Sequence, residues 1–319
     1  MTEKEYYKEK RVSSSSLKWF ELSPLFYKKM LDKEIEQETK RYFELGKKIH
    51  MKLLEEAEFE KNYIYLDYEA PKSENGKKFC EDFASNQIKD KDEKLLICYK
   101  NNYSCDKLSD QKILEKANEN ATSYKKYIRY LQKRKEVKDV LSNSDNTLIN
   151  NLYQSCKDHI AANKLLWTSD EDKMNGVEEY NEHIIFFDFL GVQCKSMIDR
   201  LVIDHKNKVF KLIDLKTTSN LGEFDHSFEE FKYYRQMAFY WIAILSEFKE
   251  LRDYTKETYI IGLQKGDLPE CKVFNIKENW LTIGLSEIEK LMQNIKWHQD
   301  NNLWEHSKEY YENNGIEKL

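Results

Sequence analysis

The sequence feature that most constrains the fold is a strand–turn–strand pattern over residues 192–217. Two apolar stretches, VQCKSMIDRLVID and VFKLIDLKT, flank the polar segment HKNK. Apolar and β-branched runs on either side of a short polar turn are typical of a β-hairpin. If the chain reverses around residues 206 and 207, facing residues have numbers that sum to about 413, and this register sets Asp199 opposite Asp214.

Charged side chains within these strands conflict with the hydrophobic pattern. Alternate residues of a strand face the same side, and one side of the second strand carries two apolar and then two charged residues: Phe210, Leu212, Asp214 and Lys216. A buried charge is costly unless it is paired or bound to an ion. Such a conflict between pattern and charge indicates a functional site.

Two facing carboxylates repel each other, and a divalent cation removes that repulsion. Mg²⁺ (or Mn²⁺) is the predicted cofactor, because Mg²⁺ binds through one or two carboxylates together with substrate phosphate oxygens. Lys216 would then orient or deprotonate the attacking water, or stabilise charge on the phosphate. The alternative is a surface hairpin with an Asp–Lys salt bridge. Asp-x-Lys alone favours that alternative, and Asp199 across the turn favours the metal site.

The rest of the chain predicts an α/β fold with a central mixed β-sheet flanked by helices and a helical N-terminal part. Hydrophobic periodicity and turn residues define its elements. The first elements are a helix that begins near residue 17 and helices over 36–59 and 124–167. Strands over 180–189, 192–204 and 209–217 follow, and then a helix over 228–248. The last elements are strands over 258–264 and 271–276 and a helix over 278–303.

Composition limits the other classes of protein. The net charge of -5 gives no field over the whole protein that would attract nucleic acid, so any such contact needs a local basic surface. The six cysteines include no CxxC pair, which argues against a zinc site or an iron–sulfur cluster. No signal peptide is visible, and no apolar run approaches the roughly 20 residues that cross a bilayer. We therefore expect a cytoplasmic protein with reduced thiols and no membrane partner.

Several motifs together resemble a known family. MIDRLVID and LIDLKTTS resemble the core of the PD-(D/E)XK nucleases, most closely the phage-type and RecE/RecB-like exonucleases. Four further segments resemble motifs of that subgroup: VSSSSLKWFELSPLFYK, LGKKIHMKLLE, YNEHIIFF and YYRQMAFYWIA. The likeness spans residues 12–60 and 140–250. Asp214 stands where many relatives carry glutamate, and the exonuclease subgroup tolerates aspartate at this position. The cysteine set that binds an iron–sulfur cluster in some relatives is missing.

The resemblance implies roles for the residues of the hairpin and of the strand before it. Asp199 and Asp214 would bind the metal, with the carbonyl of Leu215 as a further ligand. Lys216 would be the catalytic lysine. Glu182 would be an outer acidic residue that acts directly or through water; the alternative is that it only solvates the edge of a strand.

The resemblance also implies roles for residues on helices. His50 would lie near the metal as a ligand, and Gly46, one helical turn earlier, would leave room beside the imidazole. Gln236 and Tyr240, also one turn apart, would hold the DNA end or backbone. The alternatives are a half-buried histidine, a packing glycine, and a polar edge on an aromatic core helix.

Two basic or polar segments are weaker candidates for DNA contacts. Ser13 and Ser15 could bind a terminal phosphate at a helix N-terminus, although simple N-capping is favoured. A basic run could track DNA phosphates, with neighbouring tyrosines available for stacking on bases, although a solvated helix face is favoured for most of its members. The run and its tyrosines are Lys125, Lys126, Arg129, Lys133, Arg134 and Lys135, with Tyr124, Tyr127 and Tyr130.

The resemblance implies a metal-dependent deoxyribonuclease, and within that class an exonuclease acting on double-stranded DNA ends in phage recombination or DNA processing. The alternatives are a structure-specific or nicking endonuclease, and a non-catalytic DNA-binding protein with a degenerate nuclease fold. Relatives often form rings around DNA, so we expect a homo-oligomer, with a single-strand annealing protein as a further partner.

The expected domain organisation is a single nuclease domain over residues 1–319. Within it, residues 12–60 would form the N-terminal helices of the site, and residues 70–123 would form a variable insertion made of loops and short helices. Residues 177–276 would form the catalytic sheet core, and residues 278–319 a C-terminal helical part.

Overall fold

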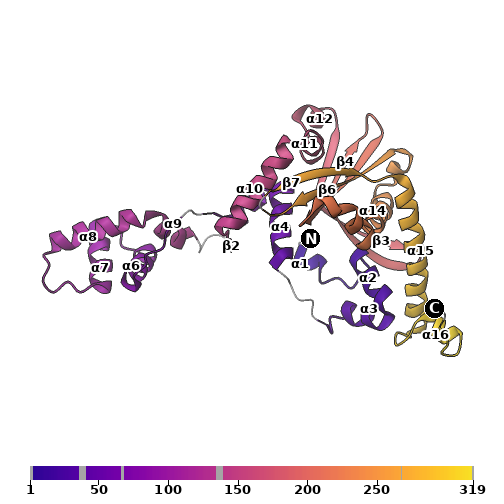
Figure 1. Cartoon of the computed structure of the whole chain (residues 1–319), viewed down its shortest axis with the longest axis horizontal. Helices are drawn as coiled ribbons and strands as arrows, with labels where there is room; N and C mark the ends of the chain where they lie inside the picture. Colours follow the sequence, from indigo (N-terminus) through magenta and orange to yellow (C-terminus); the bar gives the residue numbers. More distant parts are fainter. Residues whose placement is uncertain (1–2, 36–40, 66–67, 134–138, 267, 318–319) are drawn as a thin grey trace. The chain divides into compact units, whose positions relative to one another are not determined.

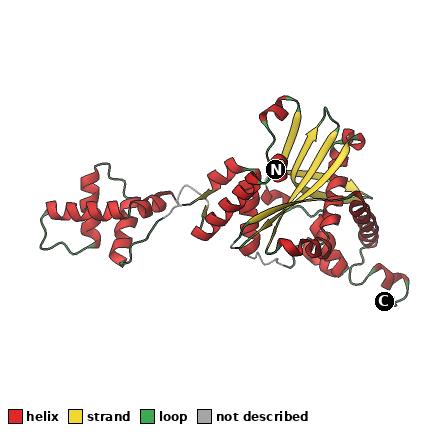
Figure 2. Ribbon diagram, turned by 45° about the horizontal axis from the view of Figure 1, so that its top comes forward, coloured by secondary structure: helices red, strands yellow, loops and turns green. Residues whose placement is uncertain are grey.

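The computed structural model describes residues 3–35, 41–65, 68–133, 139–266 and 268–317. Where the sequence predicts one nuclease domain over residues 1–319, the chain groups into two compact units. One unit comprises residues 1–55 and 148–319, and the other comprises residues 56–147. The first unit holds the β-sheet, and the second is mainly helical (Figures 1 and 2).

The first unit is built around a five-stranded mixed sheet in the order β3-β4-β5-β6-β7. Strands β5 and β6 are parallel, and the other neighbouring pairs are antiparallel. This arrangement confirms the predicted α/β fold with a central mixed sheet. The strands are β3 (Val177–Phe189), β4 (Val192–Asp204), β5 (Val209–Thr218), β6 (Thr255–Gln264) and β7 (Glu270–Asn275).

Helices surround this sheet (Figure 2). Helix α14 packs against β3, β4 and β5 and against helices α2 and α15, while α4 contacts β4 and β5. The helices of this unit are α1 (Glu3–Tyr6), α2 (Ser14–Leu22), α3 (Pro24–Leu31), α4 (Arg41–Leu54), most of α10 (Asn143–Asp158), α11 (Ile160–Leu166), α12 (Asp170–Met174), α13 (Phe224–Glu230), α14 (Tyr233–Glu247), α15 (Glu278–Asn301) and α16 (Lys308–Glu312), with 3₁₀ turns η1 (Leu221–Glu223) and η2 (Lys249–Asp253).

The hairpin of β4 and β5 has the register that the sequence predicts. Arg200 faces Ile213, and Asp204 faces Val209 at the turn. The side chain of Asp204 accepts the backbone N–H of Asn207 at 2.9 Å, which fixes the turn. Beyond the Arg200–Ile213 pair, β4 and β5 no longer pair with each other, while β4 still pairs with β3 and β5 still pairs with β6.

Three predicted helices differ from the observed ones. The helix expected over 124–167 is divided into α9 (Lys125–Lys133), α10 and α11, with the short strand β2 (Asp139–Val140) between α9 and α10, and residues 134–138 lie outside the described residues. Residues 36–40 of the helix expected over 36–59 lie outside the described residues, and the remainder forms α4 followed by α5 (Glu56–Asn62). The helix expected over 228–248 is interrupted between α13 and α14. Lys232 has a left-handed backbone, with φ 52°, which a right-handed helix cannot contain.

The second unit has a hydrophobic core of its own. It contains α5, the two short parallel strands β1 (Tyr63–Ile64) and β2 (Asp139–Val140), and helices α6 (Glu74–Ser85), α7 (Lys91–Asn102), α8 (Asp110–Ser123) and α9 (Lys125–Lys133). The core includes Phe79, Leu95 and Ile113. Residues 70–123, expected as loops and short helices, are therefore mostly packed helix, and their interpretation as a variable insertion stays a prediction.

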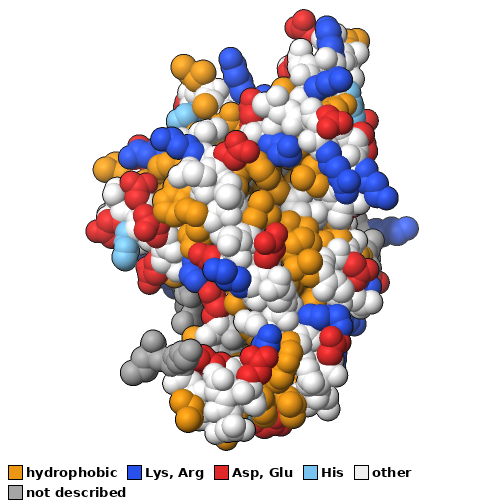
Figure 3. Space-filling view, turned by 90° about the vertical axis from the view of Figure 1, so that its right-hand side faces the viewer, with side chains coloured by type: hydrophobic (Ala, Val, Ile, Leu, Met, Phe, Trp, Pro, Cys, Tyr) orange, Lys and Arg blue, Asp and Glu red, His pale blue; other side chains and the backbone are white. Residues whose placement is uncertain are grey.

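The exposed side chains fit the mixed composition of the chain. On the face shown in Figure 3, acidic and basic side chains are interspersed among hydrophobic ones. Within the described ranges, none of the helices combines the length and the apolar character that a bilayer-crossing segment requires.

Candidate active site

The two aspartates of the hairpin lie where β4 and β5 separate. The last paired residues are Arg200 and Ile213, so Asp199 and Asp214 are the next residues on the two strands. The N–H of Leu215 donates a hydrogen bond to Asp199 Oδ2 at 2.8 Å. The Asp199 carboxylate here accepts an N–H that a backbone carbonyl would accept in a regular β-ladder. The side chain of Asp199 is therefore bonded to β5, the strand that carries Asp214.

Asp214 and Lys216 form a buried ion pair. Asp214 is fully buried, the Lys216 side chain is 17% exposed, and the ammonium group contacts Asp214 Oδ2. Burial raises the pKa of Asp214 to about 6, with a smaller contribution from Asp199, although Lys216 opposes the shift. Burial also raises the pKa of Asp199. Burial lowers the pKa of Lys216, but the charges of both aspartates outweigh it and the net pKa is raised.

His50 and Glu182 complete a group of potential metal ligands. His50 Nδ1 lies 3.6 Å from Asp199 Oδ2. Of the described residues, one group of three or more offers metal-ligand atoms within 4.8 Å of one another: His50, Glu182 and Asp199. Burial and the nearby charge of Lys216 lower the pKa of His50 to about 4. The imidazole is therefore neutral near pH 7, which is the form that binds a metal.

Glu182 reaches this group from an unusual backbone conformation. The pairs Asn181–Arg200 and His183–Ile198 belong to the β3–β4 ladder, but Glu182 and Asp199 between them do not. Glu182 has a left-handed backbone with φ 47°. Such a conformation costs a residue with a side chain about 1–2 kcal/mol, and strain of this kind is concentrated at functional sites.

Helix α14 supports the aspartates from one side. Gln236 Nε2 donates to Asp214 Oδ1 at 3.3 Å and to the Tyr240 hydroxyl at 2.7 Å. Tyr240 is buried, at 8% exposure. The structure therefore places both side chains against the acidic group, and the expectation that they contact DNA stays a prediction.

Tyr233 is a member of this site that sequence reasoning missed. The Lys216 ammonium lies 5.0 Å from the centre of the Tyr233 ring, within the range of a cation–π contact. The signal was present in YYRQMAFY, because Tyr233, Gln236 and Tyr240 follow one another at three and four residues and so share one helix face.

The serines before α2 act as a helix cap. Ser13 accepts the N–H of Ser16, and the Ser16 side chain accepts the N–H of Ser13, which forms a capping box. The Ser13 and Ser15 hydroxyls lie 3.0 Å apart. These contacts account for the serines as structural residues, and their role in binding a terminal phosphate stays a prediction.

The donor set fits a hard divalent cation. It comprises Glu182, the His50 imidazole and the Asp199 carboxylate, whose ligand atoms lie within 4.8 Å of one another. Asp214 and the backbone carbonyl of Leu215 stay predicted ligands. Oxygen donors of this kind suit Mg²⁺ and Mn²⁺. The raised pKa values of the two buried aspartates also indicate a place where added positive charge would be stabilising.

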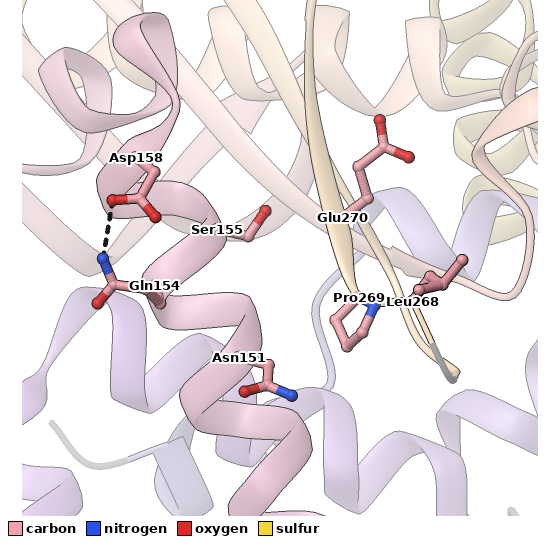
Figure 4. A pocket seen from close by; sticks show the side chains of 7 residues that line it. All are labelled: Asn151, Gln154, Ser155, Asp158, Leu268, Pro269 and Glu270. Carbon is pink, nitrogen blue, oxygen red and sulfur yellow. Dashed lines mark hydrogen bonds between the residues drawn. The ribbon is translucent and has the colours of Figure 1, made fainter.

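A hollow between α10 and the start of β7 lies apart from these residues (Figure 4). A hydrogen bond of 2.8 Å joins Gln154 and Asp158 on its α10 wall. None of the predicted site residues lines it. Its lining residues are Asn151, Gln154, Ser155, Asp158, Leu268, Pro269 and Glu270.

Comparison with known proteins agrees with this geometry. Residues 13–312 match the family described as PDDEXK-like domain of unknown function (DUF3799). A crystal structure from Eubacterium rectale, described as a "Putative exonuclease", is similar in fold with a TM-score of 0.51 and 12% sequence identity, over 100% of this chain and 95% of that one. No curated protein matches the chain. The chain belongs to the family of PDDEXK-like domains, within the PD-(D/E)XK nuclease superfamily that the sequence motifs predict.

Proposed function

We propose that this protein is a divalent-metal-dependent deoxyribonuclease that hydrolyses phosphodiester bonds at the ends of double-stranded DNA. The observation that carries this proposal is the meeting of Asp199, Asp214 and Lys216 where β4 and β5 separate. Two carboxylates and a lysine at one point, beside His50 and Glu182, can hold a divalent cation and stabilise charge on a phosphate, which supports metal-assisted phosphodiester hydrolysis.

The chain's own residues divide the work of this site. Asp199, Asp214, Glu182, His50 and the carbonyl of Leu215 would hold the cation. A cation held there would supply Lewis-acid polarisation of the phosphate and activation of the attacking water. Gln236 and Tyr240 act as positioning residues, because Gln236 bonds both the Asp214 carboxylate and the Tyr240 hydroxyl.

Lys216 acts as a cation and hydrogen-bond donor toward the phosphate. The carboxylates of Asp214 and Asp199 raise the pKa of its amine, so it holds its proton near pH 7. A protonated lysine stabilises the negative charge that grows on the phosphate oxygens during hydrolysis. This favours charge stabilisation over proton abstraction, the other role that the sequence allows.

The preference for DNA ends rests on the motifs shared with phage-type and RecE/RecB-like exonucleases. The fold similarity to the Eubacterium rectale protein agrees with it. A role in phage recombination, a single-strand annealing partner and a homo-oligomer follow from the same motifs and stay predictions.

Linear and circular DNA test the proposal. We expect the protein with Mg²⁺ or Mn²⁺ to degrade end-labelled linear duplex and to leave a covalently closed plasmid intact. Cleavage of the closed plasmid at the same rate would favour an endonuclease. Absence of metal-dependent hydrolysis on every DNA and RNA tested would overturn the proposed activity.

Metal binding can be measured without turnover. We expect Mn²⁺ at about a hundred times its Kd to stabilise the folded protein by about 2.7 kcal/mol, because the cation binds the native site only. Asp199→Asn should abolish most of this shift in a thermal melt. Asp188→Asn, which alters an exposed carboxylate on β3, is the matched control and should retain it. Equal shifts in both variants would place the metal elsewhere.

A substitution at Gly46 tests whether the space beside His50 is occupied by DNA during hydrolysis. A Cβ at Gly46 would lie 3.6 Å from Thr217 Oγ1, an ordinary contact, so the folded protein itself does not require glycine there. Alanine is preferred over glycine inside a helix by about 1 kcal/mol. We expect Gly46→Ala to raise the melting temperature and to lower kcat/KM on duplex DNA. Full activity in the stabilised variant would show that the glycine makes no room for DNA.

A further inference from the structure

Helix α9 of the second unit has two distinct faces. Tyr127, Ile128 and Leu131 are buried in the core of that unit. Lys125, Lys126 and Arg129 are exposed. At 100° per residue, these cations and Lys133 fall within an arc of about 100° that lies opposite the buried residues. The basic face, which we define as Lys125, Lys126, Arg129 and Lys133, therefore belongs to a helix held firmly by its core contacts.

The basic face differs in charge from the rest of the unit. Residues 56–147 contain equal numbers of acidic and basic residues. Helices α6, α7 and α8 each mix lysines with at least two acidic residues. Helix α9 has the sequence KKYIRYLQK and contains no acidic residue. Positive charge in a neutral unit is thus gathered on one exposed helix face, which is the electrostatic pattern that binds a polyanion.

The tyrosines around α9 limit what this face can recognise. Tyr127 is 9% exposed. The Tyr130 ring stacks on Tyr68 with ring centres 4.4 Å apart, and Tyr127 stacks on Tyr130 at 5.9 Å. Because these rings pack against one another, the base-stacking role suggested by the sequence does not fit them. Recognition by this face would rest on charge and would not read the base sequence.

We propose that the basic face of α9 binds the sugar-phosphate backbone of DNA without sequence preference. The face extends over about 12 Å, at a rise of 1.5 Å per residue. One strand of duplex DNA presents a phosphate every 3.4 Å along its axis, so the face can meet three or four phosphates. The inference rests on the proposed nuclease function and adds a second contact with DNA, on the helical unit.

The test measures binding apart from cleavage. The full chain carrying Lys216→Ala is titrated with a fluorescent duplex over a range of NaCl concentrations. The variant Lys125→Gln/Lys126→Gln/Arg129→Gln keeps helix-forming residues at exposed positions. The control Lys107→Gln/Lys112→Gln/Lys116→Gln removes three exposed lysines from the same unit, where acidic residues are interspersed, and changes the net charge equally.

We expect the α9 variant to bind DNA roughly a hundredfold more weakly at 0.15 M salt. The slope of log affinity against log salt concentration should decrease in magnitude by about 2.7, because each of the three lost phosphate contacts contributes about 0.9 to that slope. Duplexes of different sequence should lose equally, and the control should change little. Equal losses in the two triple variants, or no loss in either, would overturn the inference. Binding of phosphatidylserine vesicles through this face, with DNA affinity unchanged, would also overturn it.

Hydrolysis by the same triple variant with Lys216 intact separates this inference from the proposed function. We expect KM for duplex DNA to rise while kcat at saturating DNA stays near that of the unmodified protein. A fully active enzyme with unchanged DNA affinity would reject the role of α9 and leave the nuclease assignment standing.

Discussion

Replacing Lys216 with alanine is expected to lower kcat on linear duplex DNA by roughly a hundredfold to ten-thousandfold, the range for loss of one charge-stabilising or proton-transferring group. The variant removes the cation beside the reacting phosphate and the ion-pair partner of Asp214. The Lys216 side chain lies near the end of β5 and is 17% exposed, and its removal leaves the buried Asp214 without its ion-pair partner, so we expect some loss of stability in addition to the catalytic loss.

Single-turnover hydrolysis of end-labelled DNA measures this effect, with circular dichroism as the check on folding. Lys211→Ala removes a lysine from the same strand outside the site and should keep nearly full activity. The Mn²⁺-induced thermal shift should survive in Lys216→Ala, since its carboxylates remain. Unchanged hydrolysis in Lys216→Ala would favour the alternative of a non-catalytic DNA-binding protein.

Arg200→Met is expected to give the largest loss of stability, roughly 3–5 kcal/mol, which is typical when one partner of a buried ion pair is removed. Arg200 is 1% exposed, and its ion pair is with Glu179 at 2.8 Å. Its guanidinium donates at 2.7–2.8 Å to the Leu165 carbonyl, Asn181, Thr168 and Glu179. The lower end of the range is expected, because the Glu179 side chain is 28% exposed.

The cost of Arg200→Met should depend on pH. Burial raises the pKa of Glu179, but hydrogen bonds from Lys173, Thr168 and Arg200 and the Arg200 charge lower it to about 2. A depressed carboxyl pKa stabilises the fold above the unfolded value, near 4.5, and that contribution is lost as pH falls toward 2. The difference between the unmodified protein and the variant should therefore be largest near pH 7.

Urea unfolding at pH 7 and pH 3 tests both parts of this expectation. Arg252→Met, at an exposed arginine of η2, is the control and should change stability by less than about 0.5 kcal/mol. A difference for Arg200→Met that is the same at both pH values would show that the Glu179 ion pair contributes little.

The hairpin could be predicted from the sequence because its information is local. The alternation of residues in the two strands and the polar turn HKNK fix the register that brings Asp199 to Asp214. Arg200 shows what was overlooked. An arginine within a buried apolar strand needs partners, so its network could have been inferred, although Leu165 and Thr168 lie too far along the chain to be named from sequence.

Other features have no local signal. Lys232 and Glu182 adopt left-handed backbones that residues with side chains seldom adopt, and the surrounding structure imposes these conformations. Tyr240 belongs to an aromatic helix whose pattern does not distinguish a groove-facing hydroxyl from a buried one. The helical unit was missed as a unit because its charged residues obscure the periodicity of core residues such as Phe79.

Because of the left-handed backbone at Glu182, selection for stability and selection for activity should favour different residues at this position. Glycine adopts a left-handed conformation without steric cost, so a screen for thermal resistance alone should enrich glycine at this position. A screen for DNA turnover should enrich glutamate, because the strained conformation delivers a carboxylate to the site. The residue recovered here after directed evolution would therefore reveal which property had governed survival.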